Sequence, residues 1–306
     1  MEKIGIKKGV KMIYNYLYDI MDSISNNLAC FLSILFTLSL GKIFNVLSYR
    51  IPTKLDIEFS EDESLKYKPY YKHWYQYIPI IGEFLNNKNN IKVSNIFIEL
   101  FTILMSVVVV KLMWPNPSLI FYLIAIYFSI LLFLTDMKTY YLPDSITYLL
   151  LWTGLLGSAL QMTTITPEMS ILGAFFGYAS LYTLAYLFKI IKKTDAMAFG
   201  DFKYVAAVGA WTGPLSLCFI VFLFSIVSCF MYLIVCFVKK IDSSKIENFQ
   251  KESDKCKEIM EISDEYKDRI ILPIGPSISI SFITIIFMKY IIGISTISIG
   301  ILKFYV

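Results

Sequence analysis

The sequence predicts an all-α polytopic membrane protein of about eight transmembrane helices, with a cytoplasmic loop domain after the first span. The first observation behind this prediction is composition. The 306 residues are 57% hydrophobic and only 17% charged, with a mean hydropathy of +0.62, whereas soluble domains carry about 25% charged residues. The second observation is that several apolar runs approach the roughly 20 residues that a helix needs to cross a bilayer.

The apolar runs define eight candidate spans. They are 28–48, 94–113, 118–135, 145–162, 168–190, 203–213, 215–238 and 270–290. The sixth is short, which is compatible with a partly re-entrant segment. The sequences WPNP (114–117) and TGP (212–214) predict tight turns, because proline cannot continue a helical hydrogen-bond ladder.

The distribution of basic residues predicts the orientation in the membrane. Most of the chain's 28 Lys and Arg residues lie in four segments that the spans place on one side, 50–92, 136–144, 189–203 and 239–269. By the positive-inside rule this side is the cytoplasm. We therefore expect a multi-pass protein of the plasma membrane. Basic residues are interspersed with acids between the spans, so nothing in the chain indicates a nucleic-acid partner.

Two charged regions lie outside this simple pattern. Residues 1–27 carry four lysines but repeat apolar side chains at helical spacing. This predicts an N-terminal amphipathic helix in contact with membrane lipids. The mixed charges of residues 239–269 predict a solvated helical or flexible excursion into the cytoplasm.

Two turns near the cytoplasmic ends of spans each carry an acid. Asp136 follows one span and precedes Pro143–Asp144, and Asp201 follows Gly200 at the head of the short span. Asp144 and Asp201 could simply cap helix N-termini, and for Asp144 we keep this interpretation. Asp136 and Asp201 could instead form a carboxyl pair that shares one proton. One carboxyl would then take a proton from water while the other donates one.

Other chemistries are less well supported. The chain has one histidine, His73, in a different segment, so neither a Ser–His triad nor a histidine-rich metal site is indicated, and we predict no metal. A transporter or secretion-platform component could use the acids to bind protons or cations. Transporters place such acids near the bilayer midplane, whereas these acids lie at the ends of spans.

At these residues the chain resembles the type IV prepilin peptidases. The first aspartate motif of that family corresponds to Asp136 followed by Leu142–Pro143–Asp144, and the second to AFGDFK, 198–203. In the second motif Ala198 replaces the first glycine. PIGP (273–276), YQYIPIIGEFL (75–85) and GKIFNVLSYRIP (41–52) are similar to three further elements of the family.

The resemblance implies an intramembrane aspartic endopeptidase in which Asp136 and Asp201 are catalytic. Pro143, Asp144, Gly200 and Lys203 would be supporting residues. The substrates would be prepilins or pseudopilins, which are cleaved at the cytoplasmic membrane face. The peptidase core would occupy 114–306.

The resemblance also implies S-adenosylmethionine-dependent methylation of the new N-terminus by the region 28–113. Asn45 and Arg50 would be the methyltransferase residues. Arg50 would hold a carboxylate, with Glu83 and Glu99 as acids that could pair with it. Many family members bind zinc through cysteines in the first cytoplasmic loop, but residues 50–92 contain no cysteine.

Overall fold

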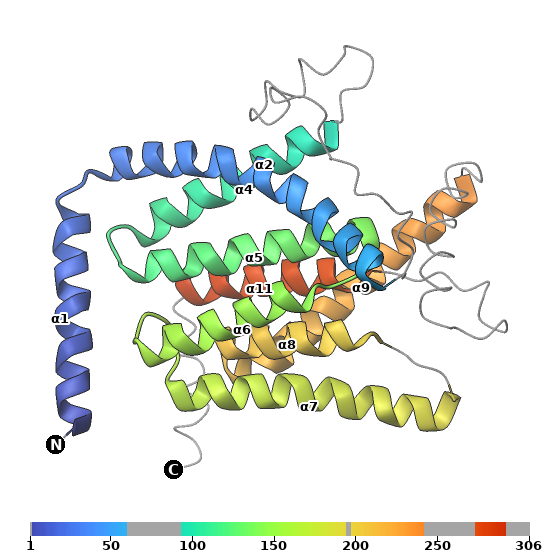
Figure 1. Cartoon of the computed structure of the whole chain (residues 1–306). Coiled ribbons are helices and arrows are strands. Elements are labelled where there is room, and N and C mark those ends of the chain that lie inside the picture. Colours follow the sequence, from blue (N-terminus) through green and yellow to red (C-terminus); the bar gives the residue numbers. More distant parts are fainter. Residues whose placement is uncertain (1, 60–92, 194–196, 242–272, 292–306) are drawn as a thin grey trace.

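The computed structural model describes residues 2–59, 93–193, 197–241 and 273–291 (Figure 1). No strand occurs within these ranges. The helices are α1 (Glu2–Asp22), α2 (Asn26–Phe59), α4 (Val93–Met113), α5 (Ser118–Thr139), α6 (Asp144–Ala159), α7 (Pro167–Lys192), α8 (Phe199–Thr212), α9 (Pro214–Ile241) and α11 (Gly275–Ile291). The prediction of an all-α polytopic membrane protein is confirmed.

Among the residues that the structure describes, five helices are long and apolar enough to cross a membrane. These segments are Asn26–Ser48 in α2, Ile96–Met113 in α4, Ser118–Thr139 in α5, Pro167–Ile191 in α7 and Pro214–Ile234 in α9. The helices α6, α8 and α11 also lie at predicted spans but are shorter, with 16, 14 and 17 residues. Both predicted tight turns are present, between α4 and α5 and between α8 and α9.

The predicted span 28–48 agrees with the apolar segment Asn26–Ser48, but the helix extends beyond the span. Helix α2 does not end near residue 48 but continues to Phe59. Loss of apolar character marks the edge of the membrane layer, whereas the helix itself can continue through Lys, Asp and Glu, which are adequate helix formers. The rest of the loop, residues 60–92, lies outside the described part of the chain, as does most of the charged excursion predicted at 239–269.

Helix α8 lies in the interior of the bundle. It packs between α6 and α7 and also contacts α9 and α11 (Figure 1). The contact with α7 is made through backbone, because a Cβ added at Gly173 would clash with the Gly209 carbonyl oxygen. On the other side the Trp211 indole donates a 2.8 Å hydrogen bond to the Leu150 carbonyl of α6. These contacts fix α8 between its neighbours.

The N-terminal helix α1 runs across the direction of α5, α6 and α7 at one end of the bundle (Figure 1). Tyr14 donates a 3.1 Å hydrogen bond to Asn116 in the turn between α4 and α5. The Trp114 indole of the same turn donates to the Ile24 carbonyl at 3.2 Å. This direction fits a helix that lies along a membrane surface rather than through it.

Candidate functional site

Asp136 occupies the last turn of α5. The helix ends where Tyr140 adopts a left-handed conformation and its N–H bonds to the Asp136 carbonyl at 2.9 Å. The following Leu142–Pro143 sequence cannot continue the helix, because proline has no N–H and restricts the residue before it. The Asp136 side chain points into the protein and is only 4% exposed.

Asp201 lies in the first turn of α8, which begins at Phe199. Its carboxyl hydrogen-bonds with the backbone of Ala198, the N-cap residue, which has no capping side chain of its own. This contact is half of a capping box, so Asp201 does help to start its helix. Gly200 allows close packing here, because a Cβ at that position would approach the Leu142 Cβ to 3.0 Å. The start of α8 therefore lies against the segment that follows α5.

The structure brings Asp136 and Asp201 together from positions 65 residues apart, counting from the numbering of the sequence. The two carboxyl groups interact electrostatically, and Asp201 is also buried. A third helix end completes the site. The backbone N–H of Gly275, the first residue of α11, donates a 2.8 Å hydrogen bond to Asp136 Oδ2. Helix N-termini favour negative charge, so α11 is suited to hold a carboxylate at this position.

Gly275 has no room for a side chain. A Cβ there would lie 2.8 Å from Asp136 Oδ2 and 3.0 Å from its Cβ and Cγ. The sequence singled out the PIGP element but gave no role for it. In the structure it provides a donor that only glycine can bring this close to the aspartate.

The prediction that Asp144 caps α6 is wrong. Asp144 is the first residue of α6, Pro143 is the N-cap, and no side chain makes a capping hydrogen bond. The Asp144 carboxylate instead binds Lys203 of α8 at 2.6 Å. The Lys203 ammonium also lies 5.5 Å from the centre of the Tyr148 ring. An available cation on the neighbouring helix is a stronger partner for the carboxylate than its own helix end.

The polar residues of α2 form a second buried cluster. Asn45 is fully buried in the described part of α2, and the ammonium of Lys42 pairs with Glu99 of α4 at 3.3 Å with both side chains almost inaccessible. Glu99 thus has Lys42 as one cation partner, and its pairing with Arg50 stays a prediction. Arg50 lies in α2, but its side chain and Glu83 are outside the described residues.

Lys138 of α5 donates a 2.7 Å hydrogen bond to Ser48 of α2. This bond joins the polar cluster of α2 to α5, the helix that carries Asp136.

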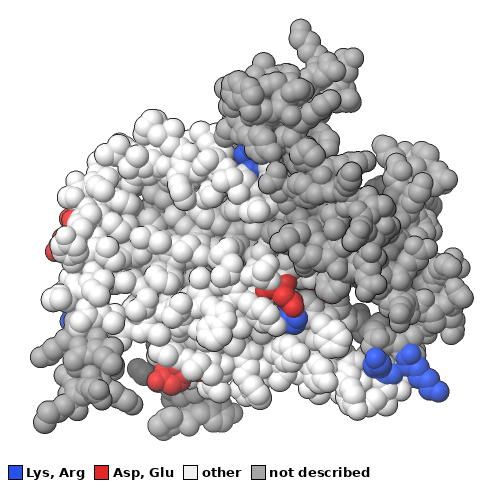
Figure 2. Space-filling model, in the orientation of Figure 1, with Lys and Arg blue, Asp and Glu red and all other residues white. Residues whose placement is uncertain are grey.

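Charged side chains are sparse over the described face of the bundle (Figure 2). The described ranges contain no group of three or more His, Cys, Asp or Glu residues that could hold a metal ion.

Asp136 and Asp201 both lie in a segment of the chain that matches a known protein family. Residues 123–237 match the sequence profile of the type IV leader peptidase family. The prepilin leader peptidase/N-methyltransferase of Klebsiella pneumoniae is 32% identical to this chain over 189 residues, which cover 58% of the chain and 82% of that protein. The chain belongs to the type IV leader peptidase family. It is therefore a peptidase.

Two further relatives carry the same name. The protein of Dichelobacter nodosus is 33% identical over 220 residues, covering 61% of this chain and 77% of the relative. The protein of Neisseria gonorrhoeae is 31% identical over 221 residues, covering 62% and 76%. No solved structure matches. The segment that matches the leader peptidase profile, residues 123–237, includes both Asp136 and Asp201. Gly275 lies outside this segment.

Proposed function

We propose that this leader peptidase removes the leader peptides of prepilin-like proteins with Asp136 and Asp201 as its catalytic pair. One observation carries the proposal: two buried carboxyls from different helix ends interact with each other, and one accepts a hydrogen bond from a third helix end. Buried acids within a membrane protein are costly and usually functional. The relatives' names, which state that they are prepilin leader peptidases, support the substrate class.

The pair would act by general acid–base catalysis. The ionised carboxyl takes a proton from a water molecule, whose oxygen attacks the carbonyl carbon of the scissile bond. The protonated carboxyl donates its proton, first toward the carbonyl oxygen and finally to the leaving amine as the C–N bond breaks. The proton removed from water replaces the proton that was donated, so no metal or covalent intermediate is required. Gly275 holds Asp136 in place during both transfers.

We infer that the site faces the cytoplasm. Counting the spans along the sequence assigns the ends of α5 and α8 that carry Asp136 and Asp201 to the same side as the Lys-rich and Arg-rich segments. The positive-inside rule assigns that side to the cytoplasm. Transport is less well supported, because the acids lie at helix ends rather than in broken helices at the midplane.

Asp136→Asn and Asp201→Asn test the proposal. An amide keeps the shape of the carboxyl but cannot exchange the proton, so each change should reduce leader cleavage by at least about 100-fold. Cleavage is measured as the size shift of a leader-containing prepilin co-expressed with the enzyme. Asp19→Asn, on the exposed surface of α1, is the matched control and should cleave normally. Normal cleavage by either site variant, when it is made and inserted as well as the control, would contradict the aspartic mechanism.

We also propose that the enzyme methylates the new N-terminus with a methyl group from S-adenosylmethionine. The relatives' names support this activity, as does the motif at 41–52. Asn45 is fully buried in α2, and the Arg50 side chain lies outside the described residues. Both stay candidate methyltransferase residues, and Arg50 is the one we test.

Mass spectrometry of the mature pilin N-terminus decides the question. Wild-type enzyme should yield a methylated N-terminus, and Arg50→Ala should lower methylation while leader cleavage continues. An unmethylated N-terminus from the wild type would mean that this chain is a peptidase alone.

A further inference from the structure

A buried tyrosine lies one helical turn beyond Asp201. Tyr204 of α8 is fully buried, and its hydroxyl is 2.8 Å from the hydroxyl of Ser279 in α11. This contact joins α8, which carries Asp201, to α11, which begins at Gly275.

The direction of these bonds follows from their donors. Ser279 donates its single hydroxyl proton to the Gly275 carbonyl at 2.9 Å. In this arrangement Ser279 has no further proton to give, so the Tyr204 hydroxyl is the donor to Ser279. The hydrogen bonds run from Tyr204 to Ser279 and from Ser279 to Gly275, the residue whose N–H holds Asp136.

These contacts close a loop around the two aspartates. Asp201 and Tyr204 are three residues apart on α8, so they lie on one face of that helix. Ser279 and Gly275 are four residues apart on α11 and are also stacked. From Asp201 the loop passes through Tyr204, Ser279 and Gly275 to Asp136, and every side-chain link in it is buried.

We propose that Tyr204 and Ser279 are positioning residues of the peptidase site, which set the place of α11 so that the Gly275 N–H meets Asp136. The inference rests on the proposed function, because it assumes that Asp136 is catalytic. A buried hydroxyl without partners costs free energy, and phenylalanine would fill the same space at no such cost. Here the hydroxyl has a partner on α11, and this bond fixes the relative positions of two helix ends that meet at the site.

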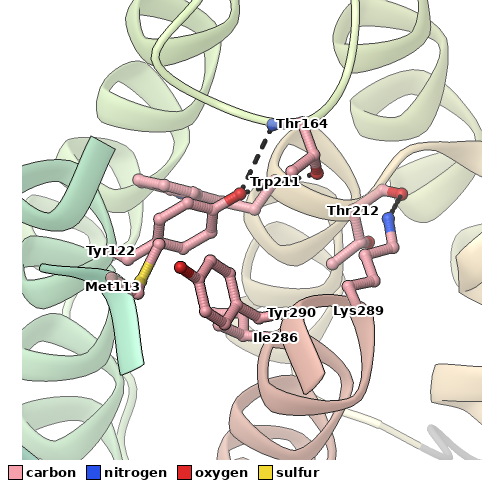
Figure 3. A pocket seen from close by; sticks show the side chains of 8 residues that line it. All are labelled: Met113, Tyr122, Thr164, Trp211, Thr212, Ile286, Lys289 and Tyr290. Carbon is pink, nitrogen blue, oxygen red and sulfur yellow. Dashed lines mark hydrogen bonds between the residues drawn. The ribbon is translucent and has the colours of Figure 1, made fainter. Parts of the chain in front are cut away.

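The fold supplies a matched control. Tyr122 is another buried tyrosine, and its hydroxyl accepts a 3.3 Å hydrogen bond from the backbone N–H of Thr164. It lines a small pocket near the start of α5, 14 residues before Asp136 and therefore about 21 Å away along the helix. The pocket residues are Met113, Tyr122, Thr164, Trp211, Thr212, Ile286, Lys289 and Tyr290 (Figure 3). Tyr122→Phe removes a buried hydroxyl of the same kind without touching the site.

A serine control also exists on α11. Ser281 is buried and donates only to the Ser277 carbonyl of its own helix at 2.8 Å. Ser281→Ala is thus the counterpart of Ser279→Ala. Ser279→Thr is the rescue variant, because threonine keeps the hydroxyl at the same position.

The experiment measures kcat and KM for cleavage of a purified leader-containing prepilin by the full-length enzyme in lipid nanodiscs, together with Tm. Tyr204→Phe and Ser279→Ala should each lower kcat about tenfold and leave KM within about twofold, since they misplace a catalytic group rather than a binding surface. The double variant should be no worse than either single variant, because both remove one connection. Ser279→Thr, Tyr122→Phe and Ser281→Ala should keep wild-type kcat.

The outcomes separate the two proposals. Loss of cleavage in Asp136→Asn under the same conditions tests the catalytic pair by itself. Wild-type kcat in Tyr204→Phe, with Asp136→Asn inactive, overturns the positioning role and leaves the proposed function intact. An equal fall of kcat in Tyr122→Phe also overturns the positioning role, because loss of any buried hydroxyl would then lower kcat. A fall of kcat in Tyr204→Phe that is explained by a lower Tm overturns it as well.

Discussion

Adding one methyl group at Gly275 should disable the site without unfolding the protein. The new Cβ would lie 2.8 Å from Asp136 Oδ2 and 3.0 Å from Asp136 Cγ, whereas non-bonded heavy atoms are stable at about 3.5–4.0 Å. Either the carboxyl or the start of α11 must therefore move by about 0.5–1 Å. The 2.8 Å hydrogen bond from Gly275 would then stretch beyond the usual limit of about 3.2 Å.

A displacement of this size is large for catalysis. Misplacing a reacting group by about 1 Å can cost 100-fold in rate, so Gly275→Ala should lower kcat for leader cleavage by about 10- to 100-fold. Stability should change little, because alanine is a better helix former than glycine by roughly 0.5–1 kcal/mol and partly offsets the local strain. The assay is single-turnover cleavage of a purified prepilin, with Tm measured on the same preparation.

The control is Gly9→Ala in α1, where a Cβ would meet nothing within 4 Å, and it should leave kcat and Tm at their wild-type values. Wild-type kcat in Gly275→Ala would show that Asp136 tolerates the displacement. The close approach of α11 would then have no part in catalysis.

Three further substitutions test other contacts. Asp144→Asn breaks the 2.6 Å bond to Lys203, but the pair is partly exposed, so kcat/KM should fall by less than about tenfold; inactivation would give Asp144 a direct role. Lys42→Met breaks the buried 3.3 Å ion pair with Glu99 and should cost about 3–5 kcal/mol of stability, as read from Tm in nanodiscs. The double variant Lys42→Met/Glu99→Leu should recover much of this loss. Gly209→Leu drives a side chain into the backbone of α7, so it should abolish accumulation of folded protein, measured by size-exclusion profile; a normal profile would contradict the close packing.

The membrane helices could be predicted well because a single physical property defines them. Apolar length alone located the helices of the bundle, and the Pro-containing turns at 114–117 and 212–214 fixed two connections. The ends of α2 and α9 could not be predicted in this way. A helix continues by hydrogen bonding and propensity after its residues cease to be apolar, as α2 does to Phe59.

The site was predicted only in part, because some of its contacts are long-range. Asp136 and Asp201 could be expected to meet, since both lie at helix ends on one side of the membrane. Their third partner is the backbone N–H of Gly275. A backbone donor cannot be recognised from the residue type, because nearly every residue has one. The bonds between Tyr204 and Ser279 and between Asp144 and Lys203 join residues far apart in the chain. The family motifs singled out Asp144 and Lys203 but gave no sign that they bind each other. Nothing in the local sequence distinguishes Tyr204 and Ser279 from ordinary buried residues.

The shortness of α8 fixes how deep the aspartates lie. Its 14 residues extend about 21 Å, whereas the hydrocarbon core of a bilayer is about 30 Å thick. Because α8 is followed at once by the turn at Gly213 and a full-length span, its other end must begin several ångströms below the headgroups. A leader can reach this depth if the surrounding lipid thins to match the short helices, at a cost of fractions of a kcal/mol per ångström. Under the proposed mechanism, bilayer thickness would thereby influence how the substrate is aligned with Asp201.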